Sequence, residues 1–267
     1  MDNSGGTGRL AGKVVLIAGA GPGGIGGAAA MLFAREGARL LIAERDLDKG
    51  AASAEAVVAA GGEAMFVQTD VTDEASVRHA VEEAVRWFGA LHVLFNTAGG
   101  SLPEDSWITD VDLGVWDRTM KVDLLGTMHT CRHAIPRIVE AGGGAVVNMS
   151  SGAALRGGSP SHIYTAAKGA ILSLTRALAA AHARDGVRVN AICAGRILSQ
   201  RIVGTYGAPG TSGPVVDRQA SGERIKEYPF WAGAPVDIAN IALFLASNES
   251  RMITGAAIPA DGGRSAY

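Results

Sequence analysis

The chain has 267 residues, and its 24 Lys and Arg against 26 Asp and Glu give a formal net charge of −2. No basic cluster stands out, so neither nucleic acid nor an anionic membrane surface is expected as a partner. No apolar run reaches the ~20 residues that would span a bilayer. Cys131 and Cys193 form no CxxC pair, and residues 1–10, expected to be a flexible leader, lack the features of a signal peptide. We therefore expect a cytoplasmic protein with free thiols.

Short apolar runs alternate with longer helical patterns along the chain. Strands are predicted at residues 13–20, 38–45, 64–70, 91–99, 144–151, 187–193 and 255–263, and helices from about residue 25 and at 47–60, 73–88, 116–140, 161–183 and 236–247. Such apolar strands, separated by helices, are typical of a parallel sheet that is covered on both faces. The predicted fold is therefore α/β, a single doubly wound, mostly parallel seven-stranded Rossmann-like sheet. No linker interrupts the pattern, so residues 1–267 are predicted to form one domain.

Residues 199–231, which follow the sixth predicted strand, are rich in Gly, Ser, Thr and Pro. Loops at the carboxyl ends of parallel strands surround the ligand crevice, so we predict that this segment is a lid over the substrate. A disordered insertion is the alternative.

A glycine-rich stretch, AGAGPGGIGG at residues 18–27, lies between the first strand and the first helix. One dinucleotide-binding pattern fits Gly19, Gly21 and Gly24, and another nearly fits Gly19, Gly24 and Gly26. Glycines permit a tight turn, and the free amides at a helix N-terminus attract a pyrophosphate. The stretch predicts a dinucleotide site, with a turn that binds nothing as the alternative.

Glu44 stands twenty residues beyond Gly24, at the end of the second predicted strand. A carboxylate there accepts hydrogen bonds from the adenosine ribose and repels a 2′-phosphate, which favours NAD over NADP. Arg45 works against this prediction because its guanidinium could accommodate the phosphate. Either charge could instead face solvent.

A third set of residues is Ser151, then Tyr164 thirteen residues later, then Lys168 four residues after the tyrosine. With the glycine loop, the NTAG stretch at residues 96–99, RVNAICAG at 188–195 and TGAAIPADGG at 254–263, this set resembles the short-chain dehydrogenase/reductase family over nearly the whole chain. The combination is far more specific than Tyr-x-x-x-Lys alone.

Physical reasoning assigns a catalytic role to each of these three side chains. Residues four apart share a helix face, so Lys168 can place its ammonium beside the Tyr164 hydroxyl and favour the phenolate form. Tyr164 can then exchange a proton with an alcohol or carbonyl oxygen, and Ser151 can hold that oxygen. The structural alternative is a surface Tyr and Lys with a capping Ser.

The resemblance also implies contacts along the cofactor. Asp70 and Val71 match a pair that contacts adenine, and Gly195, Ile197 and Ser199 lie where the nicotinamide carboxamide is bound. The resemblance further implies a homotetramer in which helices 116–140 and 161–183 form the interfaces. The full predicted cofactor set is Gly19, Gly21, Gly24, Ile25, Gly26, Glu44, Arg45, Asp70, Val71, Asn96, Ala98, Gly99, Tyr164, Lys168, Gly195, Ile197 and Ser199.

Two departures from the family pattern concern the site. Four residues instead of three separate the glycines at 19 and 24, so the loop must bulge by one residue. Asp123 occupies the position of a catalytic asparagine that anchors a proton relay to the lysine, largely through its backbone carbonyl. We expect the relay to survive and the Asp123 carboxylate to add negative charge near Lys168, which makes Asp123 a fourth catalytic candidate.

The sequence thus predicts an NAD(H)-dependent oxidoreductase that interconverts a secondary alcohol and a ketone, with a small-molecule substrate. One alternative is an NADPH-dependent 3-oxoacyl-carrier-protein reductase, and another is a dinucleotide-binding regulator without turnover. No metal site is predicted, because the six histidines have no partners at metal-ligand spacing.

Overall fold

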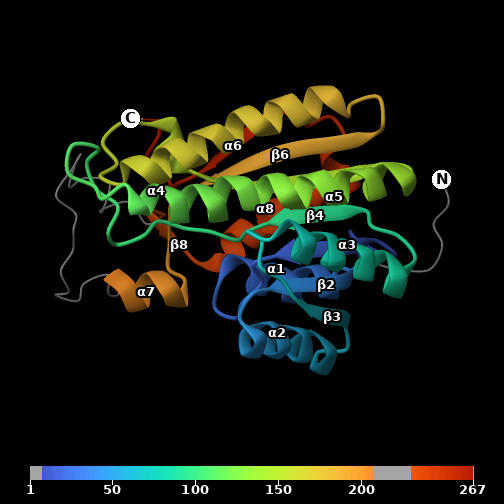
Figure 1. Ribbon diagram of the computed structural model, residues 1–267. Helices are drawn as coiled ribbons and strands as arrows, with labels where there is room; N and C mark the ends of the chain where they lie inside the picture. The colour runs from blue at the N-terminus through green and yellow to red at the C-terminus, as the bar shows by residue number, and fades with distance from the viewer. Residues whose placement is uncertain (1–7, 207–229, 267) are drawn as a thin grey trace.

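A seven-stranded parallel sheet organises the computed structural model, which describes residues 8–206 and 230–266 (Figure 1). The strands follow the order β3-β2-β1-β4-β5-β6-β9, and every neighbouring pair is parallel. The predicted doubly wound, Rossmann-like sheet is confirmed. Its strands are β1 (Val14–Ala18), β2 (Arg39–Glu44), β3 (Glu63–Gln68), β4 (Val93–Asn96), β5 (Gly144–Ser151), β6 (Val187–Ala194) and β9 (Ala257–Ala260).

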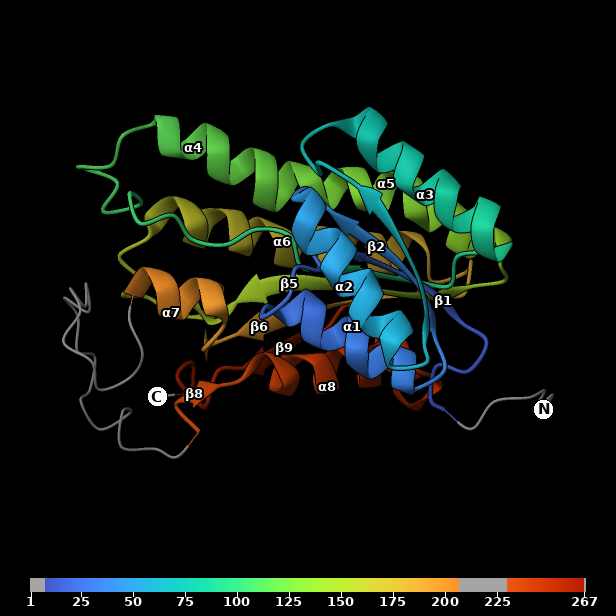
Figure 2. The ribbon, with the colours of Figure 1, turned by 90° about the horizontal axis from the view of Figure 1, so that it is seen from below.

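Helices cover both faces of the sheet (Figures 1 and 2). Side chains alternate along a strand, so Val15 and Ile17 of β1 face one layer while Val14 and Leu16 face the other. The first layer holds α1 (Ile25–Arg35), α2 (Leu47–Ala59) and α8 (Pro235–Ala246), and the second holds α3 (Glu74–Phe88), α5 (Gly126–Glu140) and α6 (His162–Ala181). In the part of the chain that the structure describes, no helix is both long and apolar enough to cross a membrane.

The helix predicted at residues 116–140 is not one continuous α-helix. It consists of α4 (Gly114–Thr119), a π-helical stretch at Met120–Leu125, and α5. The wider π turn leaves backbone groups without their usual i−4 partner. Here the Thr127 hydroxyl donates to the Asp123 carbonyl oxygen at 2.7 Å, while the Asp123 side chain is buried. The π-helical stretch thus carries one buried carboxylate, that of Asp123.

The segment predicted as a lid, residues 199–231, begins with regular structure and is followed directly by a short strand. A short helix α7 (Gln200–Tyr206) occupies its start, and the strand that follows it, β8 (Ala232–Gly233), pairs in parallel with β7 (Arg196–Ile197). Elements this short carry no periodic signal, and the sequence did not predict them. Residues 207–229 lie outside the described part, as do residues 1–7 of the predicted leader. The lid therefore stays a prediction.

Candidate active site

The predicted site residues gather at one edge of the sheet because parallel strands all end there. Gly19 directly follows β1, Glu44 ends β2, Asn96 ends β4, Ser151 ends β5, and Gly195 follows β6. These strands are neighbours in the sheet, with β1 between β2 and β4. Ligands of open α/β sheets bind in the crevice outside these carboxyl ends. The sequence-predicted residues thus share one crevice edge.

The glycine loop after β1 is packed so closely that side chains do not fit at two positions. Gly19 has φ +86°, and a Cβ on it would lie 2.6 Å from the Cα of Ala98. A Cβ on Gly26 would collide with the Gly19 carbonyl oxygen, which itself accepts a 2.6 Å hydrogen bond from Thr97 Oγ1. Packing therefore requires glycine at positions 19 and 26, whereas a Cβ on Gly21 would make only ordinary contacts, which favours the pattern formed by Gly19, Gly24 and Gly26.

The start of α1 fits a pyrophosphate group. The helix begins at Ile25 with Gly24 as its N-cap, no side chain of the described residues caps it, and its first turn has no acidic residue. Such a turn presents backbone N–H groups and a positive dipole end to an anion. In the lengthened loop before this turn, Gly23 has φ +70° and its carbonyl accepts a 3.0 Å hydrogen bond from the Gln200 N–H.

The Glu44 carboxylate faces the glycine loop. Its Oε1 accepts hydrogen bonds from the backbone N–H groups of Arg45 at 2.9 Å and Asp46 at 3.1 Å. Its Oε2 lies 3.6 Å from the point where a Cβ on Gly21 would stand. The Arg45 side chain is exposed. One carboxylate oxygen is thus fixed by the chain and the other is turned to the crevice, which fits recognition of ribose hydroxyls.

Several other predicted cofactor residues have structural contacts in the chain. Asp70 Oδ1 accepts from the N–H of Thr72 at 2.9 Å and from its hydroxyl at 2.8 Å, whereas Val71 is buried. Asn96 Nδ2 donates to Asn148 Oδ1 at 2.9 Å, which ties β4 to β5 inside the sheet. Cofactor contacts of these residues stay predictions.

The residues predicted near the nicotinamide are held at the end of β6. A Cβ on Gly195 would lie 2.5 Å from the Cα of Asp261, so β6 and the turn after β9 meet without room for a side chain. Ile197 lies in β7. The Ser199 hydroxyl accepts from the Ile202 N–H at 3.3 Å and so caps α7.

A buried ion pair joins two of the catalytic candidates. Lys168 Nζ lies 2.8 Å from Asp123 Oδ1, with side-chain exposures of 4% and 1%. The same ammonium donates to the Met149 carbonyl at 3.0 Å and lies 5.6 Å from the centre of the Tyr164 ring. Asp123 Oδ1 also accepts from the Gly100 N–H at 3.1 Å. The structure thus brings Lys168, Asp123 and Tyr164 together, as the sequence predicted.

The charges of this cluster keep Lys168 protonated. Burial by itself lowers the pKa of a lysine, but the Asp123 carboxylate and the Tyr164 phenol outweigh burial and raise the pKa of Lys168 above its ordinary 10.5. The side chain is therefore an ammonium at neutral pH, within one helical turn of the tyrosine.

The helix that carries Tyr164 and Lys168 is anchored at its start by a residue that sequence reasoning missed. Both oxygens of buried Asp105 accept backbone hydrogen bonds from α6, from the Ile163 N–H at 3.2 Å and the Tyr164 N–H at 2.8 Å. A carboxylate at a helix N-terminus is stabilising. Asp105 lies 59 residues before Tyr164 in the chain, so no local pattern indicated it.

Ser151 stands at the junction of β5 and a short 3₁₀ helix, Gly152–Leu155. It is 9% exposed, and its hydroxyl oxygen accepts a 3.2 Å hydrogen bond from the Ala153 N–H. The preceding Ser150 donates to the Lys168 carbonyl at 2.8 Å, which fixes the end of β5 against α6. The Ser151 hydroxyl proton stays available for an oxygen in the crevice.

The chain is similar to known dehydrogenases and reductases over nearly its whole length. A family model described as enoyl-(acyl carrier protein) reductase matches residues 19–265. A 2,5-dichloro-2,5-cyclohexadiene-1,4-diol dehydrogenase of Sphingobium indicum is 36% identical over 260 residues, which are 96% of this chain and 97% of the relative. A solved short-chain type dehydrogenase/reductase from Mycobacterium ulcerans is 30% identical with a TM-score of 0.84, covering 96% and 91% of the two chains.

A third similar protein is a 7α-hydroxysteroid dehydrogenase that was solved in complex with NADH and 7-oxo glycochenodeoxycholic acid. It is 27% identical, with a TM-score of 0.83, and covers 96% of this chain and 95% of that one. Fold and site together define a nucleotide-binding oxidoreductase with a Rossmann-like sheet. The chain belongs to the short-chain dehydrogenase/reductase family, whose cofactor is NAD(P)(H).

Replacement of Asp123 tests the buried ion pair. Asp123→Ala leaves the Lys168 ammonium buried without its carboxylate, so we expect the free energy of unfolding to fall by about 3–5 kcal/mol. Asp123→Asn keeps an oxygen for the Gly100 N–H and the ammonium, and should cost less. Urea unfolding of the cofactor-free protein at pH 7 measures both changes. Equal midpoints for Asp123→Ala and the parent would contradict the assignment.

Proposed function

We propose that the protein interconverts a secondary alcohol and a ketone with NAD(H). The observation that carries the proposal is the Lys168 ammonium, held between the Asp123 carboxylate and the Tyr164 ring at the crevice edge. A cation in this position stabilises negative charge that develops beside it during proton transfer. Similarity to dehydrogenases of diols and hydroxysteroids supports the reaction type.

In alcohol oxidation, Tyr164 accepts the hydroxyl proton of the substrate. Ser151, at the end of the neighbouring strand, donates a hydrogen bond to the same oxygen and fixes its position. When bound, the oxidised nicotinamide supplies the acceptor for the hydride that leaves the carbinol carbon. In ketone reduction the same groups act in reverse, and Tyr164 returns the proton.

Asp123 acts through Lys168 and is a positioning residue. Its carboxylate holds the ammonium at 2.8 Å, and the Met149 carbonyl holds it from the side of β5. Because the carboxylate is negative, it also offsets part of the positive potential that Lys168 exerts on Tyr164. Asp123 therefore fixes the position of Lys168 and, at the same time, weakens the positive potential of Lys168 at the phenol.

The preference for NAD over NADP rests on Glu44. Its Oε2 is turned to the glycine loop, where a carboxylate accepts from ribose hydroxyls and repels an added phosphate. Arg45 is exposed, and the described contacts do not direct its guanidinium to the loop.

We also retain the homotetramer as part of the proposal. Trp116, Leu125 and Met128, in the helices that the resemblance assigns to the subunit interfaces, are 45%, 37% and 44% exposed. Exposed large apolar side chains on one helical segment are typical of a surface that another subunit covers. Cytoplasmic placement is consistent with Cys131 and Cys193, which are free and buried.

Tyr164→Phe removes the proton acceptor and leaves the ring packing in place. We expect kcat for alcohol oxidation to fall by about 10²- to 10⁴-fold, the range for loss of a general acid–base group. NADH binding, followed by its fluorescence, should change by less than about twofold (~0.4 kcal/mol). A screen of alcohols at the absorbance of the reduced nicotinamide supplies the assay. An undiminished kcat in this variant would refute the proposed role.

Asp123→Asn tests the electrostatic effect of the carboxylate. With its charge removed, the ammonium of Lys168 is less compensated, so the potential at the candidate active site becomes more positive. We therefore expect the rising limb of the kcat–pH profile for alcohol oxidation to move to lower pH. Superimposable profiles, or a shift to higher pH, would exclude this effect.

Glu44→Ser tests cofactor choice. Loss of charged hydrogen bonds to the ribose should lower kcat/KM for NAD by about 10- to 100-fold, and loss of repulsion should raise it for NADP. Asp46→Ser is the matched control, because Asp46 is a nearby exposed carboxylate that pairs with Lys49 at 3.1 Å. If both variants change the NADP/NAD ratio equally, Glu44 is not the determinant.

A further inference from the structure

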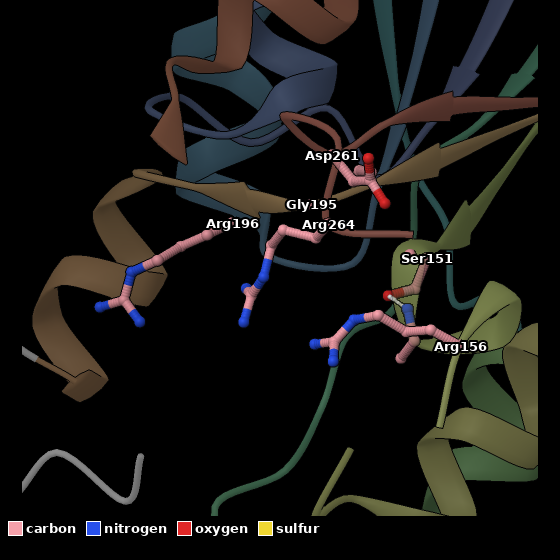
Figure 3. A pocket seen from close by; sticks show the side chains of 9 residues that line it. Ser151, Arg156, Gly195, Arg196, Asp261 and Arg264 are labelled. Atoms are coloured by element: carbon pink, nitrogen blue, oxygen red, sulfur yellow. Dashed lines mark hydrogen bonds between the residues drawn. The ribbon is translucent and has the colours of Figure 1, made fainter. Parts of the chain in front are cut away.

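A pocket of about 160 Å³ opens next to Ser151 and carries a concentration of positive charge. Three arginines from three neighbouring strand ends line it: Arg156 after β5, Arg196 after β6 and Arg264 after β9. Figure 3 shows the side chains of Arg156 and Arg264 turned toward each other, while Arg196 flanks the pocket on the other side of Arg264. All three are half-buried.

Backbone groups and an aromatic ring contact these three arginines. The Arg196 guanidinium lies 5.4 Å from the centre of the Trp231 ring, a cation–π distance. Arg264 belongs to the turn after β9, where its N–H donates to the Asp261 carbonyl at 3.3 Å. Arg156 Nη1 donates to the Gly157 carbonyl at 3.3 Å. The three arginines thus form part of the wall of the pocket.

The carboxylate in the same pocket is already used. Asp261 is buried, its Oδ1 accepts from the Gly263 N–H at 3.0 Å, and its Oδ2 accepts from the Ser265 N–H at 2.9 Å. Within residues 8–206 and 230–266, no carboxylate lies in ion-pair distance of Arg196 or Arg264. Asp261 therefore shapes the turn and leaves the positive charge of these two arginines unpaired.

Two buried donors in this pocket lack an acceptor. The Nε atoms of Arg196 and Arg264 are both buried, and neither has a hydrogen-bond partner among the described residues. An unsatisfied buried donor costs free energy, and like charges that share a pocket repel. An anion that enters the pocket would accept hydrogen bonds from these donors and reduce the repulsion between the two guanidinium groups, so its binding should stabilise the pocket.

Oxyanion groups suit guanidinium side chains best. The planar guanidinium donates two parallel hydrogen bonds to a carboxylate, sulfonate or phosphate. Because Ser151 lines the same pocket, an anion bound there lies close to the oxygen on which the proposed reaction takes place. The anion is therefore expected on the substrate, a few bonds from the reacting carbon.

The phosphates of the cofactor are placed elsewhere. The glycine loop follows β1, three strands from β6, and Glu44 ends β2, four strands from β6. With about 4.8 Å between neighbouring strands, these distances are roughly 14 Å and 19 Å. A bound dinucleotide would keep its phosphates near the loop, so the arginine pocket needs another anion.

We propose that the pocket formed by Arg156, Arg196 and Arg264 binds an oxyanion group of the substrate, so that the substrate class is an anionic secondary alcohol and its ketone. The proposal rests on the proposed function. It adds the charge of the substrate, which neither the catalytic residues nor the cofactor site determines.

Matched substrates test the proposal. 3-Hydroxybutanoate is compared with its neutral methyl ester, and a hydroxyalkyl sulfonate and a hydroxyalkyl phosphate of similar length show which oxyanion is preferred. In the parent, we expect kcat/KM for the best anion to exceed that for the ester by at least about 100-fold, as for two charge-assisted hydrogen bonds. Equal values for the ester and all three anions would overturn the proposal.

Arg264→Gln should reduce this anion-to-ester ratio by about 10- to 100-fold, chiefly through KM. Arg251→Gln is the matched control, because Arg251 is an exposed arginine thirteen residues earlier in the chain. This variant should leave the anion-to-ester ratio unchanged. An Arg264→Gln ratio equal to that of the parent would overturn the assignment of this residue.

A binding measurement separates failure of the pocket from failure of the proposed activity. Malonate, compared with chloride at equal ionic strength, should raise the Tm of the cofactor-free parent and of Arg251→Gln but not of Arg264→Gln. If no alcohol is oxidised yet malonate gives this pattern, the oxidoreductase proposal fails and the anion pocket stands. If malonate stabilises neither the parent nor Arg251→Gln, the anion pocket is refuted.

Discussion

The buried ammonium of Lys168 is the group on which the arrangement of the active site depends. A buried charge costs several kcal/mol unless oxygen atoms replace its water. Here one oxygen comes from Asp123 on the π-helical stretch and another from the Met149 carbonyl on β5. Since Asp123 in turn accepts from the Gly100 N–H, four segments of the chain are fixed around one charge. Tyr164, one turn before the lysine on the same helix, is held by Asp105, which accepts a hydrogen bond from its backbone N–H.

A second constraint acts through the absence of side chains. Gly19 and Gly26 let β1, α1 and the end of β4 approach until no Cβ fits between them. This approach leaves the first turn of α1 open at the crevice edge, where its amides face an incoming anion. The additional loop residue does not disturb this contact, and the carbonyl of Gly23 in the same loop accepts a hydrogen bond from the start of α7.

The sequence predicted the sheet well because a strand buried on both faces is a continuous apolar run. The shared helix face of Tyr164 and Lys168 was predictable too, since a spacing of four residues along a helix is a fixed geometry. The π turn at Met120–Leu125 was not predicted, because no composition distinguishes it from an α turn. Asp105 was missed because its bonds to α6 connect segments that only the folded chain brings together.

The three arginines of the pocket were missed for a different reason. Each is an isolated residue in the sequence, and the net charge of the whole chain does not reveal a local group of charges. A usable signal was nevertheless present, since Arg156, Arg196 and Arg264 all come within a few residues of a strand end. In a parallel sheet such positions converge, so single charges after neighbouring strands deserve to be considered as a set. Residues scattered over 109 positions of sequence then become one pocket.

Charge is therefore divided along the crevice edge, with Glu44 at the end of β2 and the arginine pocket beyond β5, β6 and β9. The roughly 19 Å between β2 and β6 exceeds the screening length of about 8 Å at physiological ionic strength. In the proposed function, the carboxylate thus excludes a phosphate at the ribose without weakening the attraction of an anion at the other end. In this proposal, Glu44 determines the choice of cofactor and the arginine pocket determines the charge of the substrate, so either property could change without the other. An overall charge of −2 is then compatible with a site that gathers anionic substrates, because the local field and not the sum decides where they bind.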